Sequence, residues 1–280
     1  MLPSSLTISI VTYRPDLPLL TRTLDTLATA VDAAQEAGVL KTVRLALIDN
    51  SGERDIAERV IALGRARFAE SAVQLTFLHG HANIGYGAAH NLVLHGTGAD
   101  FHLVLNPDAE LAPDALVNAF RWLDAHPEVG VLAPAMTDTA GQRQYTCKRY
   151  PAVLDLALRG FAPAAVQRLF ARRLARYEMR DVVDAEPPRE VLGVPMMSGA
   201  CMIARRDAID RSGGFDPRFF LYFEDFDWSA RLNAITRSAY VPSVCVVHHG
   251  GRASAKGWRH VAWFAASALR FYSRHGWKWW

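Results

Sequence analysis

Asn106 and Asp108 flank a proline directly after the apolar run Phe101–Leu105. Because residues i and i+2 of an extended segment point the same way, both side chains would face one ligand. Mg²⁺ and Mn²⁺ prefer oxygen donors and often bind one or two carboxylates together with substrate phosphates. Asn-Pro-Asp is equally typical of a turn, so the segment predicts either a turn or a metal-binding site.

Glu224, Asp225 and Asp227 lie among large aromatic residues in the segment 223–228. Carboxylates flanked by Phe and Trp are partly removed from water, which raises their proton affinity towards that of a general base. The alternative is a helix N-terminus, where acidic side chains interact favourably with the helix dipole. On a helix, Glu224 and Asp225 would point about 100° apart, so one would face a cleft and the other a structural partner.

Two further segments carry groups suited to a phosphorylated ligand. Segment 83–91 holds two glycines before a predicted helix, and both a glycine backbone and a helix N-terminus favour a bound phosphate. A plain strand-to-helix connection is the alternative, and the segment matches neither GxGxxG nor the P-loop. His248 and His249 follow a strand-like run, and imidazole suits Mn²⁺ better than Mg²⁺. Which of the two contacts a metal or phosphate stays open.

Alternating strand-like and helix-like segments must position these residues. Short apolar runs predict strands at 6–11, 43–48, 73–78, 101–105 and 129–132. Apolar residues three or four apart predict helices at 17–31, 55–68, 87–95 and 113–125. Strands that are apolar on both faces and alternate with helices form an α/β fold, a mostly parallel sheet covered on both sides.

Polar residues follow the predicted strands of this half, where ligands bind in parallel sheets. They are Thr12, Tyr13 and Arg14 after the first strand, Asp49 after the second, Asn83 after the third, and Asn106 and Asp108 after the fourth. The carboxyl ends of parallel strands meet at one edge of the sheet, so these side chains are expected to form one site.

The second half is less regular. Strands are predicted near 197–204 and at 239–247, on either side of the acidic, aromatic segment. Segment 151–180 is basic and amphipathic, with five arginines between 168 and 180, and the tail from Gly257 holds five of the seven tryptophans. Aromatic residues beside cations suit a membrane interface, but both segments would serve equally well in packing on the domain or in a dimer.

Composition excludes several classes of protein. The 280 residues carry 31 Lys and Arg against 28 Asp and Glu, a net charge of only +3, so nucleic acid is not an expected partner. Three widely spaced cysteines form no disulfide framework and no CxxC metal site, which indicates a reducing, cytoplasmic setting. No apolar run approaches the roughly 18 residues that span a bilayer.

The motifs, in order, resemble those of the family 2 glycosyltransferases of the GT-A fold, in the rhamnosyltransferase-like branch that builds bacterial surface polysaccharides such as O-antigen. The matching segments run from residue 6 to about 254: SIVTYRP, IDNS, NIGYGAAHN, LVLNPDAEL, VPMMSGACMIARRDAIDRSGGFDPRFFLYFEDFDWSARL and VVHHGGRAS. Each segment is weak alone, whereas the ordered set is specific. The resemblance implies a GT-A domain over 1–255, followed by an aromatic, basic C-terminal helix over 256–280. Within the domain, 1–135 would bind the nucleotide sugar and 136–255 the acceptor.

The resemblance also implies roles for individual residues. Asp225 would be the catalytic base, Asp108 and His248 would bind a divalent cation, Mg²⁺ or Mn²⁺, and Glu224 would lie on the acceptor side with the segment 198–200. That segment is Ser198, Gly199 and Ala200. The nucleotide sugar would contact Thr12, Tyr13, Arg14, Asp49, Asn83, Gly85, Asn106 and Asp108.

Two positions depart from the family pattern. Asn106 replaces the first Asp of the DxD motif, so fewer charges hold the metal and its binding would depend on bound nucleotide. His90 stands where many relatives have Arg, which would give a weaker or pH-dependent contact with the phosphates.

The expected activity is inverting, metal-dependent transfer of a sugar, with dTDP-rhamnose as the first donor to test, to a glycan or lipid-linked saccharide acceptor. One base and one metal are enough for this reaction because the nucleotide diphosphate is a good leaving group once its charge is neutralised. The alternatives are a sugar-nucleotide nucleotidyltransferase and an inactive, membrane-associated scaffold of the same fold. The leading hypothesis requires Asp108 and Asp225 to face each other across one gap.

Overall fold

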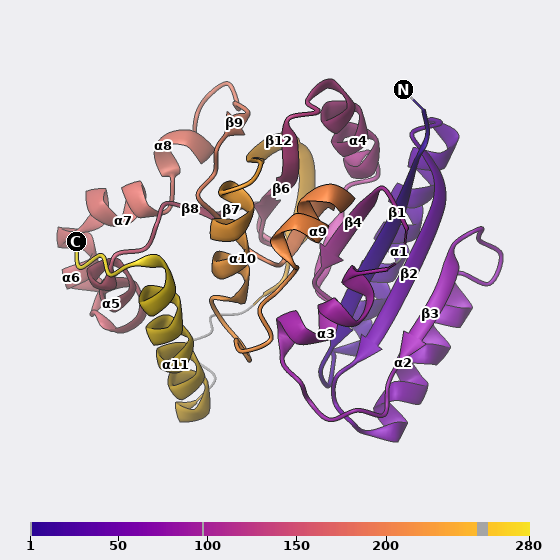
Figure 1. Ribbon diagram of the computed structural model, residues 1–280, viewed down its shortest axis with the longest axis horizontal. Coiled ribbons are helices and arrows are strands. Elements are labelled where there is room, and N and C mark those ends of the chain that lie inside the picture. Colours follow the sequence, from indigo (N-terminus) through magenta and orange to yellow (C-terminus); the bar gives the residue numbers. More distant parts are fainter. Residues whose placement is uncertain (1, 97, 251–256) are drawn as a thin grey trace.

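The computed structural model describes residues 2–96, 98–250 and 257–280 (Figure 1). A ten-stranded sheet runs through the molecule, with strand order β3-β2-β1-β4-β11-β6-β12-β5 and with β7 and β9 paired at its side. The N-terminal strands form one end of the molecule, and helices α5 to α7 and α11 lie at the other (Figure 1).

The first four strands of the sheet are parallel, as the sequence predicts. They are β1 (Ser4–Thr12), β2 (Leu40–Asp49), β3 (Gln74–Leu78) and β4 (Phe101–Leu105). The helices between them are α1 (Leu17–Glu36), α2 (Arg54–Arg67) and α3 (Tyr86–Leu94). All seven predicted elements of this region are confirmed, with ends that differ by a few residues. The carboxyl ends of β1, β2 and β4 therefore meet at one edge of the sheet.

The rest of the sheet is mixed rather than parallel. Strand β11 (Cys201–Arg205) is antiparallel to both β4 and β6 (Val129–Thr137) and separates them. Strand β12 (Arg237–His248) is parallel to β6 and antiparallel to β5 (Ala109–Leu111), which brings the end of β12 next to the segment after β4. The predicted strand near 197–204 is in fact two strands, β10 (Met196–Met197) and β11, because the chain turns at 198–200.

Helices cover both faces of the sheet. One core cluster joins β1 and β2 to α1, α2 and α4 (Ala115–Ala125). A second cluster on the opposite face joins β4, β6 and β11 to α3, α9 (Arg206–Ser212) and α10 (Glu224–Asn233). The short strands β7 (Arg143–Gln144), β8 (Cys147–Lys148) and β9 (Val191–Leu192) lie in the second half of the chain.

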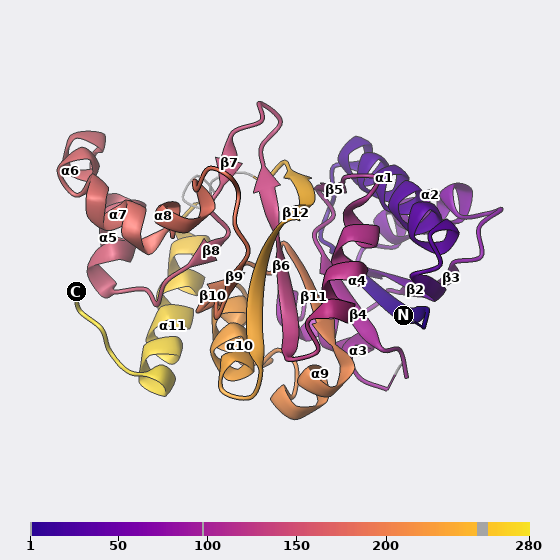
Figure 2. The ribbon, with the colours of Figure 1, turned by 90° about the horizontal axis from the view of Figure 1, so that it is seen from above.

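The basic segment 151–180 forms several short helices. They are α5 (Val153–Phe161), α6 (Ala164–Leu169), α7 (Ala171–Tyr177) and, just beyond, α8 (Arg180–Val183). Pro163 precedes α6, and Met179 adopts a left-handed conformation with φ 52° before α8, so the helix cannot continue through either position. Figure 2 shows this group beside α11 (Trp258–His275).

Helix α11 packs on the domain through one face. Ser267, Phe271 and Tyr272 are buried, and the two aromatic rings join Phe219 and Phe223 in a separate core cluster. After α11 the backbone carbonyls of Lys278 and Trp279 accept hydrogen bonds from the first residues of α5. Among the described residues, no helix is both long and apolar enough to cross a membrane.

Candidate active site

The loop after β4 and the end of β12 bring Asp108 and His248 together. Strand β12 pairs with β5 so that His248 lies opposite Ala109, and the Nε2 atom of His248 is 3.5 Å from Oδ1 of Asp108. The Asn106 amide nitrogen lies 3.3 Å from the same Nε2 atom. The two residues predicted to bind a metal are therefore neighbours, although they are 140 positions apart in the chain.

Gln144, which sequence reasoning missed, fixes the orientation of His248. Its Oε1 atom lies 2.9 Å from His248 Nδ1, and its Nε2 atom donates to the His248 carbonyl at 2.7 Å. These two contacts orient the ring so that its other nitrogen faces Asp108. Burial raises the pKa of Asp108, but the interactions with His248, a backbone hydrogen bond and the charge of His249 together lower that pKa overall.

His249 has a different partner. Its Nε2 atom lies 2.6 Å from Oε1 of Glu110, which also forms an ion pair with Arg22 at 2.9 Å. Of the two adjacent histidines, His248 is thus the one that faces Asp108. In residues 2–96, 98–250 and 257–280, no group of three or more His, Cys, Asp or Glu side chains is arranged so that it could hold a metal ion. A divalent cation at Asp108 and His248 would need ligands from a substrate diphosphate, and its preference for oxygen donors fits that arrangement.

Helix α10 begins within the acidic, aromatic segment, and its second residue is Asp225. The chain enters the helix through two left-handed residues, Tyr222 and Phe223, with φ of 69° and 61°. Asp225 Oδ2 accepts a hydrogen bond from the Gly199 amide at 2.9 Å, and Oδ1 accepts one from the Phe226 amide at 2.8 Å. Burial raises the pKa of Asp225, and these backbone hydrogen bonds only partly oppose it. A buried carboxylate of raised pKa is suited to accept a proton.

Glu224 and Asp227 have environments unlike that of Asp225. Glu224 is 5% exposed, and its Oε2 atom has no hydrogen-bond partner among the described residues. Burial and the nearby charge of Asp225 raise the pKa of Glu224 well above its ordinary value, so we infer that Glu224 holds the proton of this pair. Asp227 is fully buried and pairs with Arg231, Arg274 and His275, so its role is structural.

We expect the Glu224→Gln variant to be more stable than the wild type at pH 8 but not at pH 4. Above the ordinary pKa of Glu the unfolded chain loses its proton while the folded protein keeps it, so this group destabilises the fold as pH rises towards the raised pKa. Gln cannot ionise and removes that cost. A rise of about 2–4 °C, the shift that 1 kcal/mol produces in a large domain, is expected at pH 8. Equal unfolding temperatures at both pH values would contradict it, and Glu190→Gln, at an exposed site, is the matched control.

Tyr86 connects the metal side of the site to the base side. Its hydroxyl lies 2.8 Å from Asn106 Oδ1 and 2.7 Å from the Gly199 carbonyl. Burial raises the pKa of this hydroxyl, and so do the charges of three nearby carboxylates, which are Glu224, Asp225 and Asp108. The hydroxyl thus links Asn106, next to His248, to Gly199, whose backbone amide is bonded to Asp225. Tyr86 lies in the glycine-bearing segment 83–91, the only signal in the sequence for its place in the site.

The predicted nucleotide contacts divide into buried and exposed residues. Thr12 is fully buried and its hydroxyl donates to the Ile48 carbonyl at 3.3 Å. Asp49 is 2% exposed and accepts hydrogen bonds from the amide and hydroxyl of Ser51. In contrast, Tyr13 is 53% exposed and Arg14 stacks over its ring. Arg14 also forms an ion pair with Glu53. Tyr13 and Arg14 are thus the most accessible of these residues.

Asn50, a second missed residue, holds the glycine-bearing loop. Its amide group donates to Asn83 Oδ1 at 2.9 Å and to the Gly85 carbonyl at 3.2 Å, and its Oδ1 accepts from the Ile84 amide. Asn83 in turn accepts from the Gly85 amide at 3.0 Å. The predicted residues Asn83 and Gly85 are therefore brought next to the end of β2.

The structure shows why residue 85 is a glycine, which the sequence alone did not explain. A Cβ atom there would lie 2.5 Å from the Phe220 carbonyl oxygen, and the residue has φ of +94°. The Tyr86 amide donates to the same carbonyl at 3.0 Å. The backbone that approaches Gly85 closely is therefore that of the segment before α10. The backbone amide of Tyr86, the first in α3, already has a hydrogen-bond partner.

The expected contact of His90 with phosphates is wrong. His90 is fully buried, and its Nδ1 atom lies 2.6 Å from the Ser9 hydroxyl. Burial lowers the pKa of His90 to about 3, so the ring is neutral at physiological pH and cannot act as a pH-dependent contact for phosphate. The ring packs against Tyr86 with a centroid distance of 4.5 Å, which places it behind the site.

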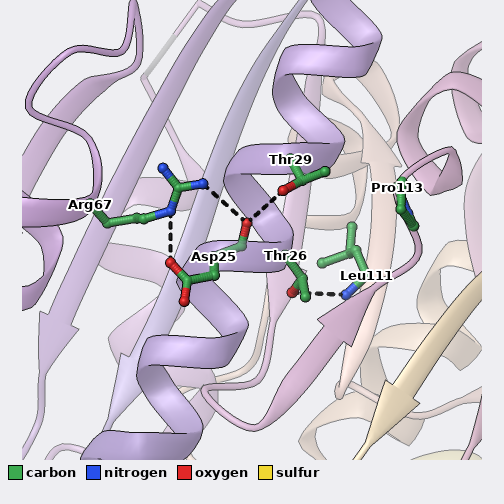
Figure 3. A pocket seen from close by; sticks show the side chains of 6 residues that line it. All are labelled: Asp25, Thr26, Thr29, Arg67, Leu111 and Pro113. Atoms are coloured by element: carbon green, nitrogen blue, oxygen red, sulfur yellow. Dashed lines mark hydrogen bonds and ion pairs between the residues drawn. The ribbon is translucent and has the colours of Figure 1, made fainter.

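A separate surface pocket of about 250 Å³ lies between α1, the end of α2 and the segment before α4 (Figure 3). Within it, Arg67 forms an ion pair with Asp25 at 2.8 Å, and the Thr26 hydroxyl accepts a hydrogen bond from the Leu111 amide. None of the predicted site residues lines this pocket. The pocket is therefore distinct from the candidate active site, and its charged groups, Arg67 and Asp25, are paired with each other.

Comparison with known proteins identifies the family of the chain. No family model matches the chain. The chain is 31% identical over 218 residues to the N-acetylglucosaminyl-diphospho-decaprenol L-rhamnosyltransferase of Mycobacterium tuberculosis, over 71% of this chain and 67% of that protein. The same match is found in two strains of that organism.

Solved structures share the fold. A mannosyltransferase of Pyrobaculum calidifontis in complex with GDP-Man and Mn²⁺ has a TM-score of 0.60 at 19% identity, covering 96% of this chain and 65% of that one. GalNAc-T7 with UDP, GalNAc and Mn²⁺ has a TM-score of 0.61 at 14% identity, covering 92% of this chain and 44% of that one. This chain thus spans less than two thirds of either solved chain. The sequence match and the shared fold show that the chain belongs to the family 2 glycosyltransferases of the GT-A fold, in the rhamnosyltransferase-like branch.

Proposed function

We propose that this glycosyltransferase is an inverting enzyme that transfers a sugar from a nucleotide diphosphate to a saccharide acceptor. The observation that carries the proposal is that the Tyr86 hydroxyl contacts both Asn106, which lies beside His248, and Gly199, whose amide is bonded to Asp225. Residues 1–135 would hold the nucleotide, and residues 136–255 would contribute the base and the acceptor side. Tyr13 and Arg14 are the exposed candidates for contact with the base and ribose.

Asp225 is the proton acceptor in this proposal. Its carboxylate would take the proton of the acceptor hydroxyl while that oxygen attacks the anomeric carbon from the side opposite the diphosphate. The bond from the anomeric carbon to the diphosphate oxygen then breaks, and the configuration inverts. Asp108 and His248, with Asn106 beside them, would hold a divalent cation, which supplies neutralising charge to the departing diphosphate. Ser198, Gly199 and Glu224 would line the acceptor side.

The donor and the acceptor follow from the sequence relative. That relative is an N-acetylglucosaminyl-diphospho-decaprenol L-rhamnosyltransferase. We therefore propose dTDP-rhamnose as the first donor to test, and a lipid-linked saccharide of surface polysaccharide synthesis as the acceptor class.

A direct assay tests the proposed reaction. The protein is incubated with Mn²⁺ and a panel of nucleotide sugars and acceptors, and release of nucleoside diphosphate is measured. Release of nucleoside diphosphate that depends on acceptor is the expected result. Production of pyrophosphate from a nucleoside triphosphate and a sugar phosphate would instead indicate a nucleotidyltransferase. No turnover with any donor or acceptor would favour an inactive scaffold.

We further propose that the outer surface of α11 and the chain end contact an anionic membrane. Trp258 and Trp280 are 79% and 80% exposed, and Val261, Leu269 and Trp279 are also exposed. Segments 151–180 and 257–280 together contain ten Lys and Arg against two Asp and Glu, whereas the rest of the chain contains 21 against 26. These two segments lie side by side at one end of the molecule (Figures 1 and 2). Exposed Trp among cations is typical of proteins that bind at the lipid headgroups.

We expect replacement of three outer residues of α11 to weaken vesicle binding without unfolding the domain. The variant Trp258→Ser, Val261→Ser, Leu269→Ser changes only exposed side chains and leaves the packed face of α11 intact. Sedimentation with vesicles that contain phosphatidylglycerol should fall by about 10-fold or more, since each buried apolar side chain contributes about 1.5–3 kcal/mol. Leu192→Ser, at an exposed site on β9, is the control. Unchanged sedimentation of the triple variant would refute the membrane contact.

A further inference from the structure

Tyr86 is held rigidly at the centre of the site. It is the first residue of α3, and its amide is bonded to the Phe220 carbonyl. The ring packs edge-on against His90 at 4.5 Å and Phe215 at 6.3 Å between centroids. A side chain fixed by packing in this way can set the position of the groups that its hydroxyl contacts.

The two partners of the hydroxyl belong to the two functional sides of the site. On one side, Asn106 Oδ1 lies 2.8 Å from the hydroxyl, and the side-chain nitrogen Nδ2 of Asn106 faces His248 Nε2. On the other side, the Gly199 carbonyl lies 2.7 Å away, and the Gly199 amide donates to Asp225. A phenol has one hydrogen and cannot donate to both oxygens at once.

Gly199 lies between Tyr86 and Asp225. A Cβ atom at this position would lie 3.3 Å from Cε1 of Tyr86 and 3.4 Å from Cβ of Asp225. A methyl group on residue 199 would therefore touch both side chains. The two segments are also joined through the main chain, since the backbone amide of Asn106 donates a hydrogen bond to the Ala200 carbonyl at 2.9 Å.

We propose that Tyr86 is a positioning residue whose hydroxyl couples the Asn106–Asp108 loop to Gly199, so that binding of a nucleoside diphosphate with a divalent cation fixes the base. When Asn106 turns towards the bound ligand, the single hydrogen of the hydroxyl is left to the Gly199 carbonyl, and Gly199, whose backbone amide holds Asp225, becomes more ordered. This inference rests on the proposed function, because it takes the ligand of the Asn106–Asp108 loop to be a nucleoside diphosphate.

Amide hydrogen exchange of the free protein tests this coupling without an acceptor. Exchange is followed by mass spectrometry with and without Mn²⁺ plus dTDP, UDP or GDP. In the wild type, the ligand is expected to slow exchange at least about 3-fold both at 104–110 and at 197–201. In Tyr86→Phe, which keeps the packed ring, slowing is expected at 104–110 but not at 197–201. Tyr150→Phe, which removes a hydroxyl bonded to the Gly276 carbonyl, should behave like the wild type.

Each outcome decides between the alternatives. Slowing at 197–201 in Tyr86→Phe equal to that in the wild type would overturn the coupling, and so would a wild type in which only 104–110 responds. If none of the nucleotides changes exchange anywhere in the wild type, the proposed nucleotide-dependent function fails, a result distinct from loss of coupling alone. A second variant, Gly199→Ala, keeps the Tyr86 hydroxyl but crowds the same contact, and it should also lose the response at 197–201.

Discussion

Asp225→Asn is expected to reduce sugar transfer by about 10²–10⁴-fold, the contribution typical of a positioned general base. The Asn side chain keeps nearly the same size and retains one oxygen for the Gly199 amide, but it cannot accept the proton of the acceptor hydroxyl. Binding of the nucleotide should stay within about 2-fold of wild type, because the loss concerns the transition state alone. Steady-state kinetics and nucleotide titration measure the two quantities.

The pH dependence of wild-type activity provides a second test of Asp225 as the base. The pKa of Asp225 is raised by burial, so kcat/KM should fall on the acid side at a higher pH than an ordinary Asp would give. Asp181→Asn is the matched control, since this exposed carboxylate pairs with Arg149 and should leave activity unchanged. Wild-type turnover by Asp225→Asn would refute its assignment as the base.

Asp108→Ala is expected to weaken metal and donor binding together, with a loss of activity of about 10²-fold. Asp108 is the carboxylate that faces His248, so its removal leaves Asn106 and His248 to hold a divalent cation without a carboxylate. Since second-shell changes already reduce metal affinity by about 10–100-fold, loss of a direct ligand should have at least that effect. Calorimetric titration of Mn²⁺ in the presence of nucleoside diphosphate measures it.

Glu110→Gln separates this effect from a general loss of negative charge. Glu110 lies two residues further along the chain, but it pairs with His249 and Arg22. We expect its Mn²⁺ affinity to stay within about 3-fold of wild type. If Asp108→Ala bound Mn²⁺ and nucleotide as tightly as wild type, the metal assignment would be wrong, whereas the role of Asp225 would be unaffected.

The N-terminal half of the fold could be predicted because each element carries its own periodic signal. Strands β1, β2 and β4 are buried runs between helices with apolar stripes, and local patterns of this kind fix both element type and order. The position of β11 could not be predicted, because a short apolar run pairs equally well in either direction. Its antiparallel insertion between β4 and β6 depends on contacts between residues 71 to 104 positions apart.

The sequence could suggest the residues whose side chains would carry out the chemistry. It could not suggest the residues that only orient those side chains. Asp108, Asp225 and His248 could be proposed because each has a side chain able to bind a metal or accept a proton and lies near the end of a predicted strand or in the acidic, aromatic segment. Tyr86 and Gln144 were missed, since a Tyr in a glycine-bearing segment and a Gln in a two-residue strand have no distinctive pattern. Their importance lies only in which atoms they reach across the fold.

The triple pairing of Asp227 has a practical consequence for handling the protein. Two of its three partners, Arg274 and His275, come from the last turn of α11. Truncation of the polypeptide before Arg274 would leave the fully buried carboxylate of Asp227 with Arg231 as its remaining partner. Asp227 lies two residues from Asp225 in the sequence. Affinity tags and fluorescent fusions are therefore better placed at the amino end, and loss of activity after carboxyl-terminal trimming would report damage to α10 rather than to a distant anchor.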